Sequence, residues 1–262
     1  MRGKLNLANL AGWITLAIGC VSLIGATIYN HQILAFIGLG LTFWGIILAY
    51  IRSEEYVKES FMNAACLSSL EALNQLMDKL GCTEKAIYLP PKYMKEPENS
   101  MAFIPKDKLS TLPKPEQMQR EDIDLSIENP EGLLITPPGN DLTKLFEKTL
   151  ETSFTRVDFQ YLQLNLPKIF TEELEIAQHI EIDSENNKIH VKIENSPYTH
   201  LAKEIARLSK VYESLGCPLS SAIACAIAKA TGKPVKIEKQ EIKEAAKTMV
   251  IEYSLLEEDA KN

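Results

Sequence analysis

The chain has 262 residues, of which 45% are hydrophobic and 24% charged, a composition that excludes a disordered protein. Its formal charge of −7 is unevenly distributed: residues 1–52 contain no acid and sum to +3, and the other 210 residues sum to −10. A body this acidic argues against nucleic-acid binding, because phosphate contacts need clustered Lys and Arg.

The N-terminal region contains 47 consecutive residues, Leu5–Ile51, without Asp, Glu, Lys or Arg. About 20 apolar residues cross a bilayer as a helix, so this run predicts two spans, Leu10–Ile28 and Ile33–Ile51. Residues 1–51 are therefore expected to form a transmembrane helical hairpin. Small residues recur four apart, and we expect them to pack the two spans together rather than to form a dimerisation face: Ser22/Ala26, Gly38/Thr42 and Gly45/Ala49.

Basic residues flank both spans, with Arg2 and Lys4 before the first and Arg52 and Lys58 after the second. The connecting turn has none, so a multi-pass protein of the plasma membrane with two spans and both termini in the cytoplasm is predicted. A secretory signal peptide is the alternative, but the apolar run is too long and lacks a clean cleavage site. Neither span carries a charge, which favours an anchor over a transporter.

Residues 52–81 are expected to form a juxtamembrane helix that ends at Gly81. Its apolar residues are spaced by four and three, which predicts a seam of about two heptads: Cys66, Leu70, Leu73, Met77 and Leu80. We expect this seam to pack on its own domain; pairing with a second copy is the alternative.

Residues 82–138 form a proline-rich region that holds nine of the 13 prolines. Prolines at the ends of short apolar runs fit short strands rather than helices. The predicted strands are Ala86–Leu89, Met101–Ile104, Ile123–Ile127 and Leu133–Ile135, and residues 106–122 are predicted to be an exposed loop.

The pattern of helices and strands expected over residues 139–258 predicts an α+β domain, and residues 259–262 are a tail. Asp141 is a candidate N-cap for a helix over Leu142–Leu150. A second helical stretch starts at Phe159 and is expected to break at Pro167. Alternating isoleucines then predict a hairpin with its turn at 184–187.

That hairpin is expected to pair Ile182 with Ile189, which places Glu181 across from His190. These two side chains are candidates for an acid–base pair, although a solvated cross-strand contact is the preferred interpretation.

Two more helices and two more strands complete the domain. One amphipathic helix carries the stripe Leu201, Ile205, Leu208, Tyr212 and Leu215. The next, Pro218–Thr231, is apolar almost all round but too short to span a membrane, so it is predicted to be a central buried helix ended by Gly232. Strands are expected at Pro234–Ile237 and Thr248–Tyr253, with a helix between them.

The sequence contains no CxxC, HExxH, phosphate-binding glycine loop or GxSxG motif, so no metal and no cofactor are expected. Scattered cysteines are typical of a reducing compartment. Cys217 is the candidate nucleophile, because it precedes the helix that opens at Pro218, where free N–H groups lower a thiol pKa. The preferred interpretation is a buried structural cysteine. In that case Cys217→Ser should cost more stability than Cys217→Ala, because the hydroxyl would be unpaired.

Several short segments follow the hairpin in a fixed order: Tyr88-Leu-Pro-Pro, Met101-Ala-Phe-Ile-Pro, Pro130-Glu-Gly-Leu-Leu-Ile-Thr-Pro-Pro-Gly and the Gly216–Val235 segment. In this order they resemble a family of uncharacterised archaeal membrane-anchored proteins, known as a domain of unknown function. The resemblance covers most of residues 53–258 and implies a prokaryotic, archaeal plasma membrane. It brings no catalytic residues.

The sequence as a whole predicts a membrane-anchored cytoplasmic domain that binds a partner protein or a small ligand. The expected partners are the lipid bilayer and a protein or a second copy, and not nucleic acid. The alternative is a membrane-bound enzyme with Cys217 as its nucleophile.

Overall fold

The computed structural model describes residues 7–50, 58–96, 98–106, 112–118, 126–128, 130–243, 245 and 247–257. The chain divides into two compact units, Met1–Glu59 and Ser60–Asn262, called here the hairpin and the domain.

The hairpin consists of α1 (Leu7–Tyr29) and α2 (Gln32–Tyr50), which match the two predicted spans; Ile51 lies outside the described residues. The helices touch at glycines. A Cβ on Gly12 would lie 2.5 Å from the Ala49 nitrogen, and one on Gly45 would lie 2.5 Å from the Leu16 nitrogen. The small residues therefore bring the two backbones of one hairpin together, as the sequence predicts.

The described strands of the domain form one antiparallel sheet of eight, in the order β3-β4-β2-β1-β7-β8-β6-β5. Their bounds are β1 Ile87–Leu89, β2 Met101–Pro105, β3 Ser126–Glu128, β4 Glu131–Ile135, β5 His179–Glu185, β6 Lys188–Glu194, β7 Val235–Lys243 and β8 Thr248–Leu255. The α+β prediction is confirmed. The short-strand region and the region after it share this sheet, because β1 pairs with β7.

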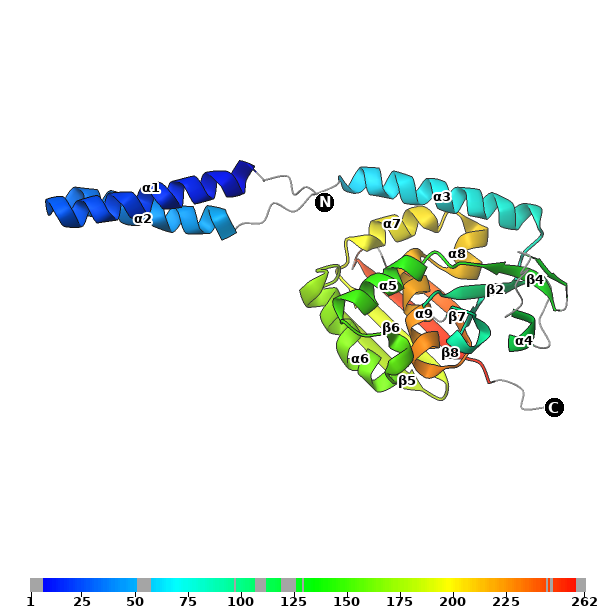
Figure 1. Ribbon diagram of the computed structural model, residues 1–262. Coiled ribbons are helices and arrows are strands. Elements are labelled where there is room, and N and C mark those ends of the chain that lie inside the picture. The colour runs from blue at the N-terminus through cyan, green and yellow to red at the C-terminus, as the bar shows by residue number, and fades with distance from the viewer. Residues whose placement is uncertain are drawn as a thin grey trace. The chain divides into compact units, whose positions relative to one another are not determined.

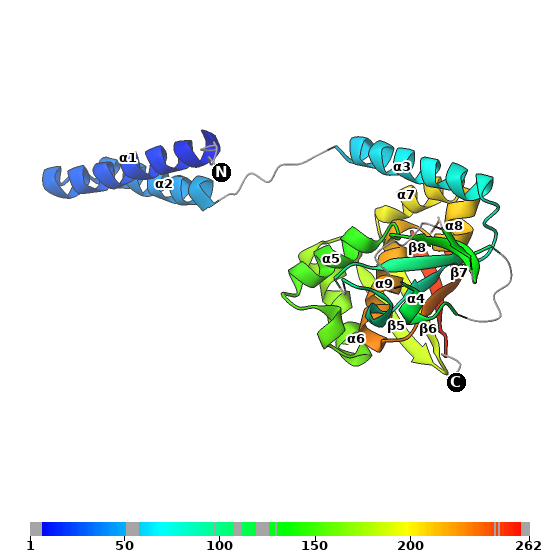
Figure 2. The ribbon, with the colours of Figure 1, turned by 45° about the vertical axis from the view of Figure 1, so that its right-hand side comes forward.

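Helix α9 (Pro218–Thr231) lies at the centre of the domain. One side rests on the sheet, and α5 (Asn140–Thr149) and α6 (Phe159–Lys168) pack over it (Figures 1 and 2). Protein surrounds the helix, which is why its sequence is apolar on almost every side. The Tyr253 hydroxyl donates to the Ser220 carbonyl, 3.0 Å away, and joins α9 to the sheet. The predicted buried helix is confirmed with the same bounds.

Strands β1, β2 and β4 are buried on both faces. Successive strand residues point to opposite faces, so Tyr88 joins the core around α9 while Ile87 and Leu89 join a smaller core on the other side. Tyr93, in the 3₁₀ turn η1 (Pro91–Tyr93), is part of that smaller core. By contrast, β5 and β6 alternate between buried and exposed residues, which indicates one solvated face.

Helix α3 (Glu59–Lys79) packs on the domain through Leu70 and Met77, next to α7 (Tyr198–Ile205) and α8 (Ser209–Leu215) (Figure 1). The Asn74 side chain accepts from the Val211 backbone N–H of α8 at 3.2 Å. The predicted apolar seam thus faces its own domain, except that Leu80 is exposed. The predicted start of this helix, residues 52–57, lies outside the described residues.

Several predicted helix boundaries were wrong. Asp141 lies inside the first turn of α5, and Gly139 is the N-cap. Pro167 does not break α6 but lies within its last turn, and a π-helical turn, Ile169–Glu173, follows. In the predicted exposed loop, the described residues include a short helix, α4 (Pro115–Met118).

The predicted amphipathic helix is two helices, α7 and α8, because Leu208 takes φ −87° and ψ 75°, outside the helical region. Strand β7 continues to Lys243, through residues where a helix was predicted. Its extra length is paired with β8 as far as Lys243↔Thr248, so tertiary pairing overrides the local pattern.

The predicted register of the β5–β6 hairpin was wrong by two residues. Asn186 and Asn187 both have positive φ, 49° and 63°, which gives a two-residue turn in place of the predicted four. Ile182 therefore faces Val191. The shift is even, so the isoleucines still face the core.

The same shift separates the proposed Glu181–His190 pair. Glu181 faces Lys192, and its carboxylate lies 3.2 Å from the ring of His179. His190 faces Asp183 on β5 and Glu252 on β8. The acid–base pair is excluded by the register, and both groups belong to the solvated face.

Among the described residues, three helical stretches are long and apolar enough to cross a membrane: Ala11–Tyr29, Gln32–Tyr50 and Ser209–Thr231. The third stretch comprises α8 and α9, and 89% of it is buried. Its apolar side chains thus serve the core of the domain, whereas those of the first two stretches are mostly exposed.

Candidate functional site

A polar groove with a volume of about 780 Å³ opens beside α5 and the 3₁₀ turn η2 (Phe154–Arg156). Charged and hydroxyl side chains line it: Glu98, Lys144, Glu147, Lys148, Glu151, Thr152, Ser153, Thr155 and Arg156. Acids and bases are equal in number, so the groove suits a polar ligand rather than an apolar one.

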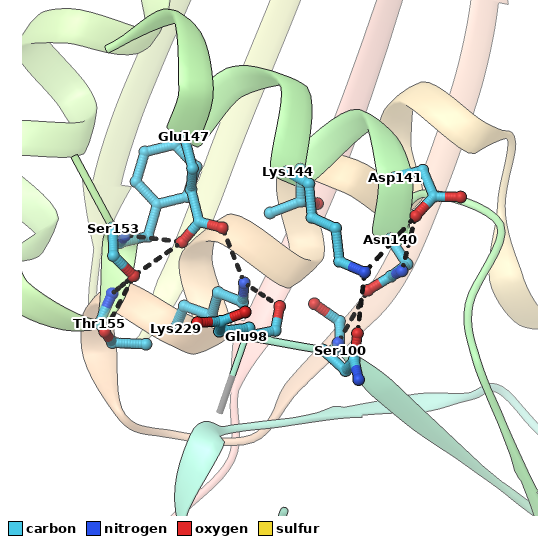
Figure 3. A network of polar contacts seen from close by, with 12 residues as sticks. Glu98, Ser100, Asn140, Asp141, Lys144, Glu147, Ser153, Thr155 and Lys229 are labelled. Carbon is cyan, nitrogen blue, oxygen red and sulfur yellow. Dashed lines mark hydrogen bonds and ion pairs between the residues drawn. The ribbon is translucent and has the colours of Figure 1, made fainter. Parts of the chain in front are cut away.

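A buried ion pair lies next to this groove (Figure 3). Lys229, in the last turn of α9, donates to the Glu147 carboxylate at 3.0 Å and to the Glu98 carbonyl at 2.9 Å. The Lys229 side chain is 1% exposed and that of Glu147 is 14% exposed. A buried ammonium group must be paired and hydrogen-bonded, so these contacts hold α9, α5 and the segment before β2 in one arrangement.

The second oxygen of Glu147 binds the turn that follows α5. It accepts from the Phe154 backbone N–H at 2.8 Å and from the Ser153 hydroxyl at 3.1 Å. Ser153 in turn caps η2 by accepting from the Thr155 N–H. One carboxylate thus fixes both the central helix and the wall of the groove.

The other end of the groove is joined to the strand region. Lys144 donates to the Asn99 side chain at 2.8 Å. The Ser100 N–H donates to the Asn140 side chain at 2.8 Å, and both of these residues are labelled in Figure 3. Helix α5 is thereby tied to the segment that leads into β2. These contacts make the groove a preformed surface.

The charged side chains at the groove differ in how they are paired. Glu147 and Lys229 neutralise each other and are fully engaged. Lys148 and Arg156 are exposed and, within the described part of the chain, their side chains make neither an ion pair nor a hydrogen bond. Two such cations beside hydroxyl groups can recognise an anionic group on a ligand.

Sequence reasoning missed this site, although one signal was present. Lys229 is the only charged residue in the apolar helix Pro218–Thr231, and a lysine in a buried helix needs a partner. The sequence alone does not identify that partner, because Glu147 is 82 residues away and is one of many acidic residues.

Cys217, the predicted candidate nucleophile, lies away from the groove. It is the N-cap of α9, fully buried, and its Sγ accepts from the Ser220 N–H at 3.5 Å. Burial raises the pKa of the Cys217 thiol, and hydrogen bonds from Ser220 offset part of that effect. A thiol with a raised pKa is mostly protonated at neutral pH, which disfavours a nucleophile.

The structure reverses the expected order of two substitutions at Cys217. A serine hydroxyl there would find the Ser220 N–H, the usual contact of a serine N-cap. We therefore expect Cys217→Ser to destabilise the domain less than Cys217→Ala. The alanine variant lacks the N-cap, and its free energy of unfolding should fall by about 1 kcal/mol. Urea unfolding of both variants measures this.

Native alkylation provides the companion measurement. Cys217 should react slowly with iodoacetamide at neutral pH, more slowly than the partly exposed Cys66. Fast and selective labelling of Cys217 would support the enzyme alternative.

In the described residues, no group of three or more His, Cys, Asp or Glu side chains is placed to hold a metal ion.

Fold and site together define a class of protein: a two-helix apolar hairpin joined to an α+β domain with a buried central helix and a polar groove. Residues 11–254 match the model of a family described as a domain of unknown function (DUF7982), and the chain belongs to this family. Comparisons with curated proteins and with solved structures find no significant match.

Proposed function

We propose that the protein is anchored in the plasma membrane by its hairpin and carries the domain in the cytoplasm. One observation supports the anchor: the hairpin helices turn large apolar side chains outward, including Val21, Ile28, Phe36 and Phe43. In water this surface would be unfavourable, and soluble monomers rarely expose contiguous apolar patches of that extent. A bilayer covers it.

Two features support the cytoplasmic side. Arg2, Lys4, Arg52 and Lys58 flank the hairpin, and the turn between the spans has no base. All five cysteines are free thiols, which agrees with a reducing compartment.

We expect both termini to lie in the cytoplasm. Reporter fusions at Met1, at Asn262 and in the turn at His31 measure this: the terminal fusions should report the inside and the turn fusion the outside. Resistance of the full chain to extraction by alkaline carbonate is the control for integration. A terminal fusion that reports the outside would contradict the proposed topology.

We also propose that the domain is a binding module for a polar ligand or partner at the groove. The supporting observation is that the ion pair beside the groove is internally neutralised, while charged side chains of both signs in the groove have no partner in the described structure: Glu98, Lys148, Glu151 and Arg156. An enzyme built on Cys217 is the second candidate, and the alkylation rate of that thiol separates the two.

A further inference from the structure

An exposed apolar pair lies at the start of α3. Phe61 is 68% exposed and Met62 is 55% exposed, while the opposite side of the same helix is buried through Leu70 and Met77. Residues 60–70 contain no charged side chain. This surface, formed by Phe61, Met62 and the exposed Ala65, is called the α3 apolar surface.

We propose that the α3 apolar surface rests on the bilayer, an inference that depends on the proposed membrane anchor. In the domain, the described large apolar side chains that are exposed are Phe61, Met62, Leu76, Leu80, Leu145 and Leu164. Phe61 and Met62 are the adjacent pair in this set and are nearest in sequence to α2.

The length of the connection supports the proposal. Residues 51–60 separate Tyr50, the last residue of α2, from Phe61. A fully extended chain covers at most about 3.6 Å per residue, so Phe61 lies within about 40 Å of Tyr50 whatever conformation the connection takes. The tether keeps this pair near the proposed membrane anchor, and burial of Phe and Met side chains at the acyl boundary is favourable.

The net charge of the segment before α3 indicates whether its contact with lipid would be electrostatic or apolar. Residues 51–60 carry Arg52 and Lys58 against three acids, Glu54, Glu55 and Glu59, so their net charge is −1. Attraction to anionic lipid does not drive the contact. It is apolar, and it should persist at high salt and on zwitterionic lipid.

A second copy fits this surface less well. A helix pair needs apolar residues at a and d positions over three or more heptads. Beyond Met62 the exposed side of α3 presents Ala65, Ser69 and Ala72 before Leu76. Small and polar residues in the middle leave no continuous apolar seam.

Photo-cross-linking of the full chain in native membranes tests the proposal. The photoreactive residue p-benzoylphenylalanine replaces Phe61 in one variant, Phe36 of the hairpin in a second, and Leu164 of α6 in a third. Phe36 and Leu164 are matched in exposure, at 77% and 70%. We expect lipid adducts, identified by mass, at positions 36 and 61 at low and high salt, and none above background at position 164.

Each other outcome overturns the inference in a distinguishable way. Lipid adducts at position 36 but not at 61 would overturn the α3 contact and leave the anchor intact. Absence of adducts at both would overturn the anchor and the contact together. A covalent dimer through position 61 would assign the surface to a second copy. Equal lipid adducts at positions 61 and 164 would also overturn the inference, because α3 would then contact lipid no more than α6 does.

Discussion

We expect Glu147→Leu to lower the free energy of unfolding of the domain by about 3–5 kcal/mol, because it leaves a buried ammonium without its counterion. Lys229 would retain only the Glu98 carbonyl among its described partners. The same change removes the acceptor for the Phe154 N–H at the start of η2. Urea unfolding measured by near-UV circular dichroism follows the effect.

The matched control is the double variant Glu147→Leu/Lys229→Met. Replacement of a whole buried pair by apolar residues is often close to neutral, so the double variant should recover most of the loss. If the single and double variants lost the same free energy of unfolding, an unpaired buried charge could not be the cause of the destabilisation. Trp13 and Trp44 both lie in the hairpin unit with three of the nine tyrosines, so the domain is followed through its own six tyrosines.

We expect Gly139→Ala to destabilise the domain by more than about 3 kcal/mol, because α5 starts in direct contact with the backbone of α9. A Cβ on Gly139 would lie 2.0 Å from the Ala222 nitrogen and 2.4 Å from the Ser221 carbonyl carbon. Backbone atoms of a packed helix cannot rotate away, so the two helices would have to separate. The Gly139 N–H would then lose its 3.0 Å bond to the Ser221 hydroxyl.

Gly232→Ala is the control for this prediction. Gly232 has a positive φ of 66°, yet no atom lies within 4 Å of its added Cβ. Only backbone strain remains, so we expect Gly232→Ala to lower the free energy of unfolding by about 1–2 kcal/mol. Thermal unfolding of both variants compares them, and a Gly139→Ala variant no less stable than Gly232→Ala would exclude close packing as the cause.

The elements that could be predicted from the sequence are those whose signals are local. The uncharged run Leu5–Ile51 is long enough for two membrane spans, and it forms the two helices α1 and α2. Pro218 and Gly232 mark the ends of α9 through their own backbone preferences. The apolar composition of α9 also required that it be covered on all sides, and the structure places it between the sheet and two helices.

The tertiary structure decided whatever depends on a distant partner. Two positive φ angles, at Asn186 and Asn187, set the β5–β6 register and separated Glu181 from His190. Pairing with β8 kept β7 extended to Lys243. The groove and its ion pair exist because packing brings Lys229 to Glu147, and the seam of α3 faces inward because Leu70 and Met77 find the core. Periodicity marks which residues need a partner, but the choice among distant partners is made by the packing of the whole domain.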